Sequence, residues 1–163
     1  MTVQINYKNS ASTNVSSNLV LFVDEKFNIS GLKKCISNSE FLYISDLLKN
    51  GDLKKDLLFF EINSKKTVFL VSIKKDAKIS DIENLGAKFH GNINYDKKQE
   101  YFINSDTVHS KIKNFVGHFL HGLRLKSYEF NIYKSKKNKK LVSINVIGNK
   151  KKISAQDLSL IHI

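Results

Sequence analysis

The chain has 163 residues, of which 41% are hydrophobic and 26% are charged. These values exclude a globally disordered chain, and the length predicts a single domain. No apolar run approaches the roughly 20 residues that a membrane helix needs. The amino terminus also lacks the basic and apolar regions of a secretory signal, so we expect a cytoplasmic protein without membrane contact.

The charge is strongly basic, because 27 lysine and arginine residues face 15 acidic ones, for a net charge of +12. Such an excess favours nucleic acid or another anionic surface as a partner. Arg124 is the sole arginine, and proline and tryptophan are absent, a bias that an AT-rich genome also produces. A dense lysine cluster runs from Lys134 to Lys140, but no aromatic RNA-binding signature accompanies it.

The first 36 residues predict two strands. Apolar and polar residues alternate over 3–7, as in a half-buried strand. Residues 9–18 are rich in Ser, Thr and Asn and predict a loop. The continuous apolar run at 19–23 is typical of a strand that is covered on both faces. The pattern of residues 27–36 does not distinguish a helix from a strand or a loop.

A helix and a hairpin follow. Ser37 and Glu40 have the spacing of a capping box, which predicts the start of a helix that Gly51 can end in the left-handed conformation. The apolar, partly β-branched segments 57–62 and 67–73 flank a short polar turn and predict a β-hairpin.

The second half continues the alternation of helices and strands. Ser80 and Glu83 predict another capped helix, and residues 100–104 a short strand. Residues 128–132 alternate in the manner of a strand, and residues 141–147 also predict a strand. The strongest helical stripe of the chain lies between residues 104 and 128 and comprises Ile112, Phe115, Val116, Phe119, Leu120 and Leu123. This alternation argues for a layered α/β domain.

Histidine and cysteine positions suggest no reactive site. His118 and His121 have a spacing that can place two imidazoles on one metal, but His121 would point away from the apolar stripe and no acidic residue lies one turn away on that helix. We therefore interpret both as surface histidines, and His90, His109 and His162 show no partner pattern.

Cys35 is the single cysteine. It allows no internal disulfide, and a small buried side chain is a better interpretation than a catalytic Cys–His pair. The seven glycines form no phosphate-binding loop, and no G-x-S-x-G or H-E-x-x-H motif occurs. From its residues, the chain is predicted to hold no catalytic, cofactor-binding or metal-ligating residue.

One segment carries a family resemblance. Residues 119–137, FLHGLRLKSYEFNIYKSKK, resemble a segment of the leucyl aminopeptidase (cytosol aminopeptidase) family in which a helix ends in a glycine-containing turn. Weaker matches lie at 44–52 and the hairpin after it, at Leu85-Gly86-Ala87 and at 154–157. The positions that match the segment are Gly122, Leu125, Ser127, Tyr128, Phe130, Tyr133, Lys134, Lys136 and Lys137.

The resemblance implies a macro-like three-layer α/β domain, with a mixed sheet and flanking helices, that is not itself catalytic. In this family a larger carboxy-terminal domain holds two divalent metals, expected to be Mn or Zn, which activate water against the peptide carbonyl. The family's G-K-G and N-T-D-A-E-G-R motifs carry those groups and neither occurs here. Family members typically assemble as homo-hexamers, and some bacterial members bind DNA.

The resemblance also sets the expected boundaries. Residues 1–150 would form the amino-terminal domain, and residues 151–157 would begin the linker to a catalytic domain that this sequence does not reach. Residues 158–163, LSLIHI, match the translation of a transposon end used as a sequencing adapter, so we expect the native sequence to stop at Asp157.

The expected function is that of a non-catalytic amino-terminal domain of a metal-dependent leucyl aminopeptidase, inactive alone and partnered by its own catalytic domain in a homo-hexamer. One alternative is a free-standing basic module that binds nucleic acid. Another is a macro-like domain that binds ADP-ribose, which the missing glycine-rich loop disfavours.

Overall fold

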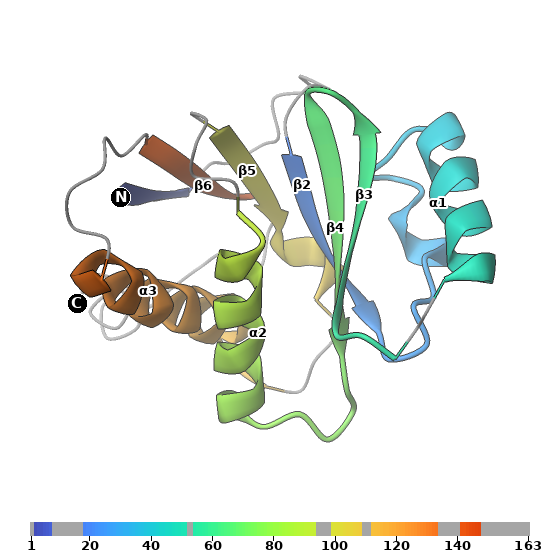
Figure 1. The fold of residues 1–163 in the computed structure, drawn as a ribbon. Helices are drawn as coiled ribbons and strands as arrows, with labels where there is room; N and C mark the ends of the chain where they lie inside the picture. The colour runs from blue at the N-terminus through green and yellow to red at the C-terminus, as the bar shows by residue number, and fades with distance from the viewer. Residues whose placement is uncertain are drawn as a thin grey trace.

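The structure, a computed structural model, describes residues 2–7, 18–51, 54–93, 99–108, 112–133 and 141–147. Six strands form one mixed sheet in the order β1-β6-β5-β2-β4-β3, with every neighbouring pair parallel except β3 and β4 (Figure 1). The predicted α/β class is confirmed. The strands are β1 Thr2–Tyr7, β2 Asn18–Asp24, β3 Leu57–Asn63, β4 Lys66–Ile73, β5 Gln99–Asn104 and β6 Leu141–Ile147.

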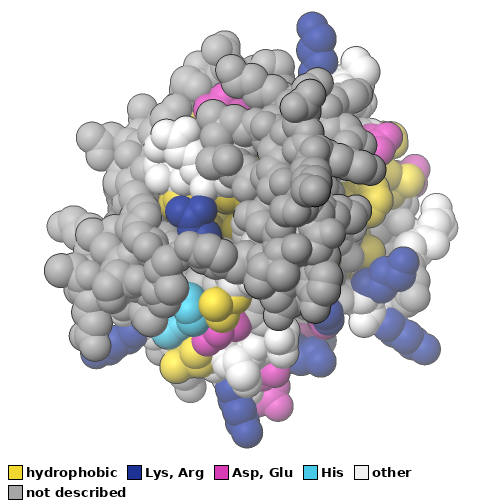
Figure 2. Space-filling view, turned by 60° about the vertical axis from the view of Figure 1, so that its left-hand side comes forward, with side chains coloured by type: hydrophobic (Ala, Val, Ile, Leu, Met, Phe, Trp, Pro, Cys, Tyr) yellow, Lys and Arg dark blue, Asp and Glu magenta, His cyan; other side chains and the backbone are white. Residues whose placement is uncertain are grey.

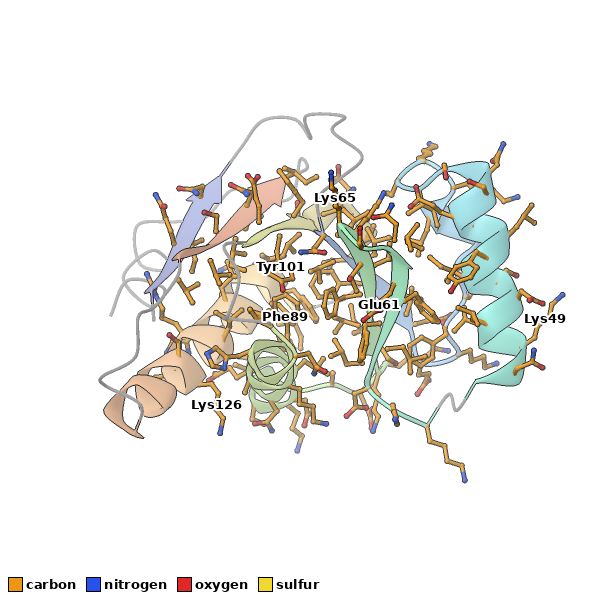
Figure 3. All side chains as sticks on the ribbon, turned by 45° about the horizontal axis from the view of Figure 1, so that its top comes forward. Lys49, Glu61, Lys65, Phe89, Tyr101 and Lys126 are labelled. Carbon is orange, nitrogen blue, oxygen red and sulfur yellow. The ribbon has the colours of Figure 1, made fainter. Side chains whose placement is uncertain are left out.

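Helices lie on both faces of the sheet. One face packs against α2 (Ile79–Gly91) and α3 (Phe115–Tyr133), and α1 (Asn38–Asn50) packs against the other, over β2 and β4. Aromatic rings meet between the sheet and α2. Phe89 of α2 and Tyr101 of β5 point toward each other in Figure 3, with ring centroids 5.6 Å apart. Two short 3₁₀ helices, η1 (Ser30–Leu32) and η2 (Ser105–Thr107), follow β2 and β5.

The start of α1 follows the predicted capping box. The Glu40 backbone N–H donates to the Ser37 hydroxyl, at 3.2 Å. The Oε1 atom of Glu40 also accepts from Nζ of Lys66 at the start of β4, at 3.2 Å, and the ion pair is closest between Nζ and Oε2, at 2.9 Å; both side chains are less than 10% exposed. The predicted left-handed end at Gly51 is wrong, because Gly51 has φ −93° and ψ 164°, which is extended backbone.

Two other helix boundaries differ from prediction. The helix α2 begins at Ile79. The Lys78 backbone N–H at its start donates to the Asp81 carboxylate, at 2.8 Å, whereas the predicted capping carboxylate was that of Glu83. The helix α3 runs without a break to Tyr133, so the strand predicted over 128–132 and the helix end implied near Gly122 are both wrong. An apolar alternation over only five residues is too short to distinguish a strand from the continuation of a helix.

The helices α2 and α3 touch backbone to backbone. A methyl group placed on Gly86 would overlap the backbone oxygen of Phe119, and one placed on Gly122 would overlap that of Glu83. Both glycines therefore face the opposite helix, where no side chain fits. Beside this crossing the His121 ring approaches the Glu83 carboxylate, at 3.3 Å.

The last turn of α2 carries a buried histidine. His90 is 3% exposed, and its pKa is lowered to about 4, first by burial and then by the charge of Lys126 on α3. Its imidazole is therefore neutral at physiological pH.

Several sequence predictions lie outside the described residues. These are the loop at 9–17, the lysine cluster at 134–140, the turn at 148–149, the linker and adapter segments, and His109 and His162.

The backbone contact of α2 with α3 predicts opposite effects for two kinds of glycine substitution. Gly86→Ala and Gly122→Ala should each lower the free energy of unfolding by about 1–3 kcal/mol, because the helices must move apart. The matched control is Gly117→Ala on α3, where the new methyl would lie 3.7 Å from the nearest atom, an ordinary contact. It should be neutral or stabilising by up to about 1 kcal/mol. Denaturant unfolding measures all three, and equal midpoints would contradict the close crossing.

The buried His90 predicts a pH dependence of stability. Its folded-state pKa of about 4 lies below the ordinary histidine value of 6.5, so the unfolded chain binds the proton more tightly. The resulting stabilisation is complete above pH 6.5 and is lost as the pH falls toward 4, by about 3 kcal/mol. His90→Gln should flatten this part of the stability curve, whereas His118→Gln should not. Parallel curves for the wild type and His90→Gln would show that His90 is not the group responsible.

Candidate ligand-binding cleft

The order of the strands creates a switch point between β2 and β5. After β2 the chain passes to the face that α1 covers, and after β5 it passes to the face that α3 covers. The two strands pair only from Asn18 to Val20 on β2 and from Tyr101 to Ile103 on β5, so the second half of β2 extends beyond its pairing with β5. In open α/β sheets, crevices at such points are the usual ligand sites.

A cleft of about 1200 Å³ lies at this point. Its apolar base includes Phe22 and Ile73, which are 1% and 7% exposed. Polar groups reach it from three directions: the segment after β2, the end of β4 and the segment after β5. An apolar base with a few convergent polar groups is the usual composition of a small-molecule site.

The segment after β5 is fastened to three strands. The Thr107 hydroxyl accepts from the Phe22 backbone N–H, at 3.0 Å, and donates to the Asn104 carbonyl, at 2.7 Å. The Ser105 hydroxyl donates to the carbonyl of Ile147, at 2.7 Å. Both hydroxyls are buried, so this wall of the cleft is held in place by hydrogen bonds that solvent does not weaken.

Cys35 lies where two walls of the cleft meet. Its sulfur accepts from Nδ2 of Asn104, at 3.3 Å. Burial raises the pKa of the Cys35 thiol above its ordinary value, the Asp106 carboxylate raises it further, and the Asn104 hydrogen bond lowers it. A thiol with a raised pKa is a poor nucleophile at neutral pH. The half-buried position differs from the full burial expected from the sequence.

Charges of both signs line the cleft. Lys34, Lys74 and Lys75 contribute cations and form no ion pair with any residue that the structure describes. Asp24 and Asp106 contribute carboxylates. The Asp24 Oδ1 atom already accepts from two backbone N–H groups, those of Lys26 at 3.1 Å and Asn28 at 2.9 Å. Sequence analysis did not predict this grouping, because the residues are far apart in the chain.

The histidines singled out in the sequence do not meet the cleft. His90 and His121 lie between α2 and α3, and the His121 side chain is 16% exposed, so it is more enclosed than a surface histidine. His118 is half-buried on α3. Within the described segments, no three His, Cys, Asp or Glu side chains gather as metal ligands would. No helix in those segments has both the length and the apolar character needed to cross a bilayer.

The sequence matches no protein-family model and no curated protein. Solved structures do resemble the fold. A mutant of tomato leucine aminopeptidase superposes with a TM-score of 0.67 at 15% identity, covering 98% of this chain and 35% of the tomato chain. The macrodomain of Thermus aquaticus DarG gives 0.53 at 8% identity, covering 88% of this chain and 98% of that domain.

A third neighbour is leucyl aminopeptidase from Leishmania major in complex with actinonin, with a TM-score of 0.50 at 8% identity, covering 90% of this chain and 29% of that one. The chain thus spans about a third of the length of the two aminopeptidases. At these identities the likeness concerns the fold alone. The mixed sheet with helices on both faces is a macro-like α/β fold, as the sequence predicted.

Proposed function

We propose that this chain is the amino-terminal, accessory domain of a peptidase of the leucyl aminopeptidase kind, and that it does not itself hydrolyse peptides. The observation that carries the proposal is the superposition of 98% of the chain on a third of the tomato enzyme, with a higher TM-score than the separate DarG macrodomain gives. A domain-sized match inside a longer enzyme is what a non-catalytic module of such an enzyme would produce.

Further support comes from the local chemistry of the chain. The Cys35 thiol has a raised pKa and accepts a hydrogen bond from the Asn104 amide, so it lacks the features of an activated nucleophile. The G-K-G and N-T-D-A-E-G-R motifs of the family do not occur in the sequence. In the intact protein, two divalent metals would therefore be held by residues outside this chain, and a homo-hexamer would be the expected assembly.

A second candidate function is nucleic-acid binding, which the distribution of charge favours. The described segments hold 15 basic and 12 acidic residues, so they carry three of the 12 net positive charges and the other segments carry nine. Five of these lie on the lysines of residues 134–140. On the face seen in Figure 2, the described lysine and arginine side chains are scattered and form no continuous patch.

The first proposal is tested by the source DNA beyond codon 157. We expect the native reading frame to continue into a G-K-G segment and an N-T-D-A-E-G-R segment. The purified 163-residue chain should release no leucine from a leucyl anilide with added Mn²⁺ or Zn²⁺. A stop codon directly after Asp157, or metal-dependent hydrolysis by this chain, would overturn the proposal.

The second candidate is tested by the salt dependence of binding to duplex DNA. If residues 134–140 contact phosphates, replacing their five lysines by glutamine should reduce the slope of log K against log salt by up to about 4. A control replaces five exposed lysines of the described core, and it should change the slope much less. Equal effects of both variants, or no binding at low salt, would remove this function. The control positions are Lys26, Lys49, Lys55, Lys65 and Lys113.

A further inference from the structure

The cleft at the β2–β5 switch point holds features that decide what kind of ligand it can take. Its lining combines three lysines that form no ion pair with a described residue, two carboxylates and an apolar base. A polyanion such as a nucleoside diphosphate would be attracted by Lys34, Lys74 and Lys75 but repelled by Asp24 and Asp106. A zwitterionic ligand carries an anionic group that can pair with the lysines and a cationic group that can pair with a carboxylate.

The lysines and the Asp106 carboxylate lie on different segments of the cleft lining. Lys74 and Lys75 directly follow β4, and Lys34 lies on the segment that leads into α1. Asp106 lies on η2, in the wall fastened by Thr107 and Ser105. A ligand with a carboxylate at one end and an ammonium group at the other can therefore satisfy two different walls.

The apolar base of the cleft indicates that the ligand also has an apolar part. Leu32 and Ile73 are 4% and 7% exposed and line the cleft beneath the charged rim. The space of about 1200 Å³ exceeds what one free amino acid fills. An apolar side chain lying on this base would be removed from water, which contributes about 25 cal/mol for each Å² buried.

We propose that this cleft binds a short zwitterionic peptide with apolar side chains, with its carboxylate toward the lysines and its ammonium group toward Asp106. The biological sense of such a site rests on the proposed function, because an accessory domain of a peptidase would meet the peptides that the enzyme consumes or releases. The cleft would be a peptide-binding site separate from the catalytic site of the intact protein.

One glycine offers a way to fill the cleft without disturbing the fold. Gly31 of η1 lines the cleft, and a Cβ atom added there would meet nothing within 4 Å. Gly91 at the end of α2 is equally open but does not line the cleft. Gly31→Leu and Gly91→Leu therefore form a matched pair, in which only the first should obstruct the ligand.

The test is a titration of the full 163-residue chain with Leu-Leu, followed by amide chemical shifts and by the rate at which a thiol reagent labels Cys35. We expect shifts at Gly31, Lys34, Asn104 and Asp106, and slower labelling. The N-acetylated, C-amidated dipeptide should bind at least about tenfold more weakly, because it lacks both charges. Gly31→Leu should lose the response and Gly91→Leu should keep it, with both variants melting as the wild type does.

Two results would overturn the proposal. One is binding of inorganic phosphate or ADP-ribose in the cleft without binding of Leu-Leu, which would identify a polyanion site. The other is the absence of cleft shifts with any of these probes. Neither result bears on whether the reading frame continues into a catalytic domain, so failure of the cleft proposal is distinguishable from failure of the proposed function.

Discussion

The contact between α2 and α3 is the constraint on which the rest of the structure depends. Gly86 and Gly122 bring the two backbones together, and the paired helices form the layer over one face of the sheet. With that face occupied, the segment between β2 and β3 packs on the opposite face as α1. Neighbouring strands β2 and β5 then lead to opposite faces, and this divergence opens the cleft.

A buried ion pair sets the position of the opposite layer. Glu40 of α1 and Lys66 of β4 are both nearly inaccessible to solvent, and each is the other's counter-charge. Moving α1 along or across the sheet would leave one buried charge without its partner, which is far more costly than losing a hydrophobic contact. The pair therefore restricts where α1 can pack, whereas the apolar contacts around Ile44 supply most of the attraction.

Local signals in the sequence predicted local structure well. The Ser37–Glu40 spacing and the hairpin turn at 63–65 describe interactions between residues close in the chain, and the structure contains both. The predicted end of a helix at Gly122 failed for the opposite reason. Glycine breaks helices through its conformational freedom, but here it is needed for its lack of a side chain against Glu83, a residue of another helix.

The cleft could not be predicted from the sequence because its members share no local pattern. Cys35, Asn104 and Asp106 come together only through the order of the strands, and no motif spacing records that order.

A macro-like fold by itself leaves the ligand open. The tomato aminopeptidase and the DarG macrodomain both resemble this chain, at 15% and 8% identity. The chain matches about a third of the tomato enzyme but nearly the whole DarG macrodomain. What such folds share is the location of the crevice, which follows from strand order. What they need not share is its lining, and function depends on that lining. In this chain Asp106 stands on the rigid wall of the crevice, fixed by neighbours that bond to three strands. The backbone that carries the Asp106 carboxylate is therefore fixed at the cleft, and a carboxylate there disfavours an anion and favours a cationic group, which is why we propose a zwitterion and not a polyanion as the ligand.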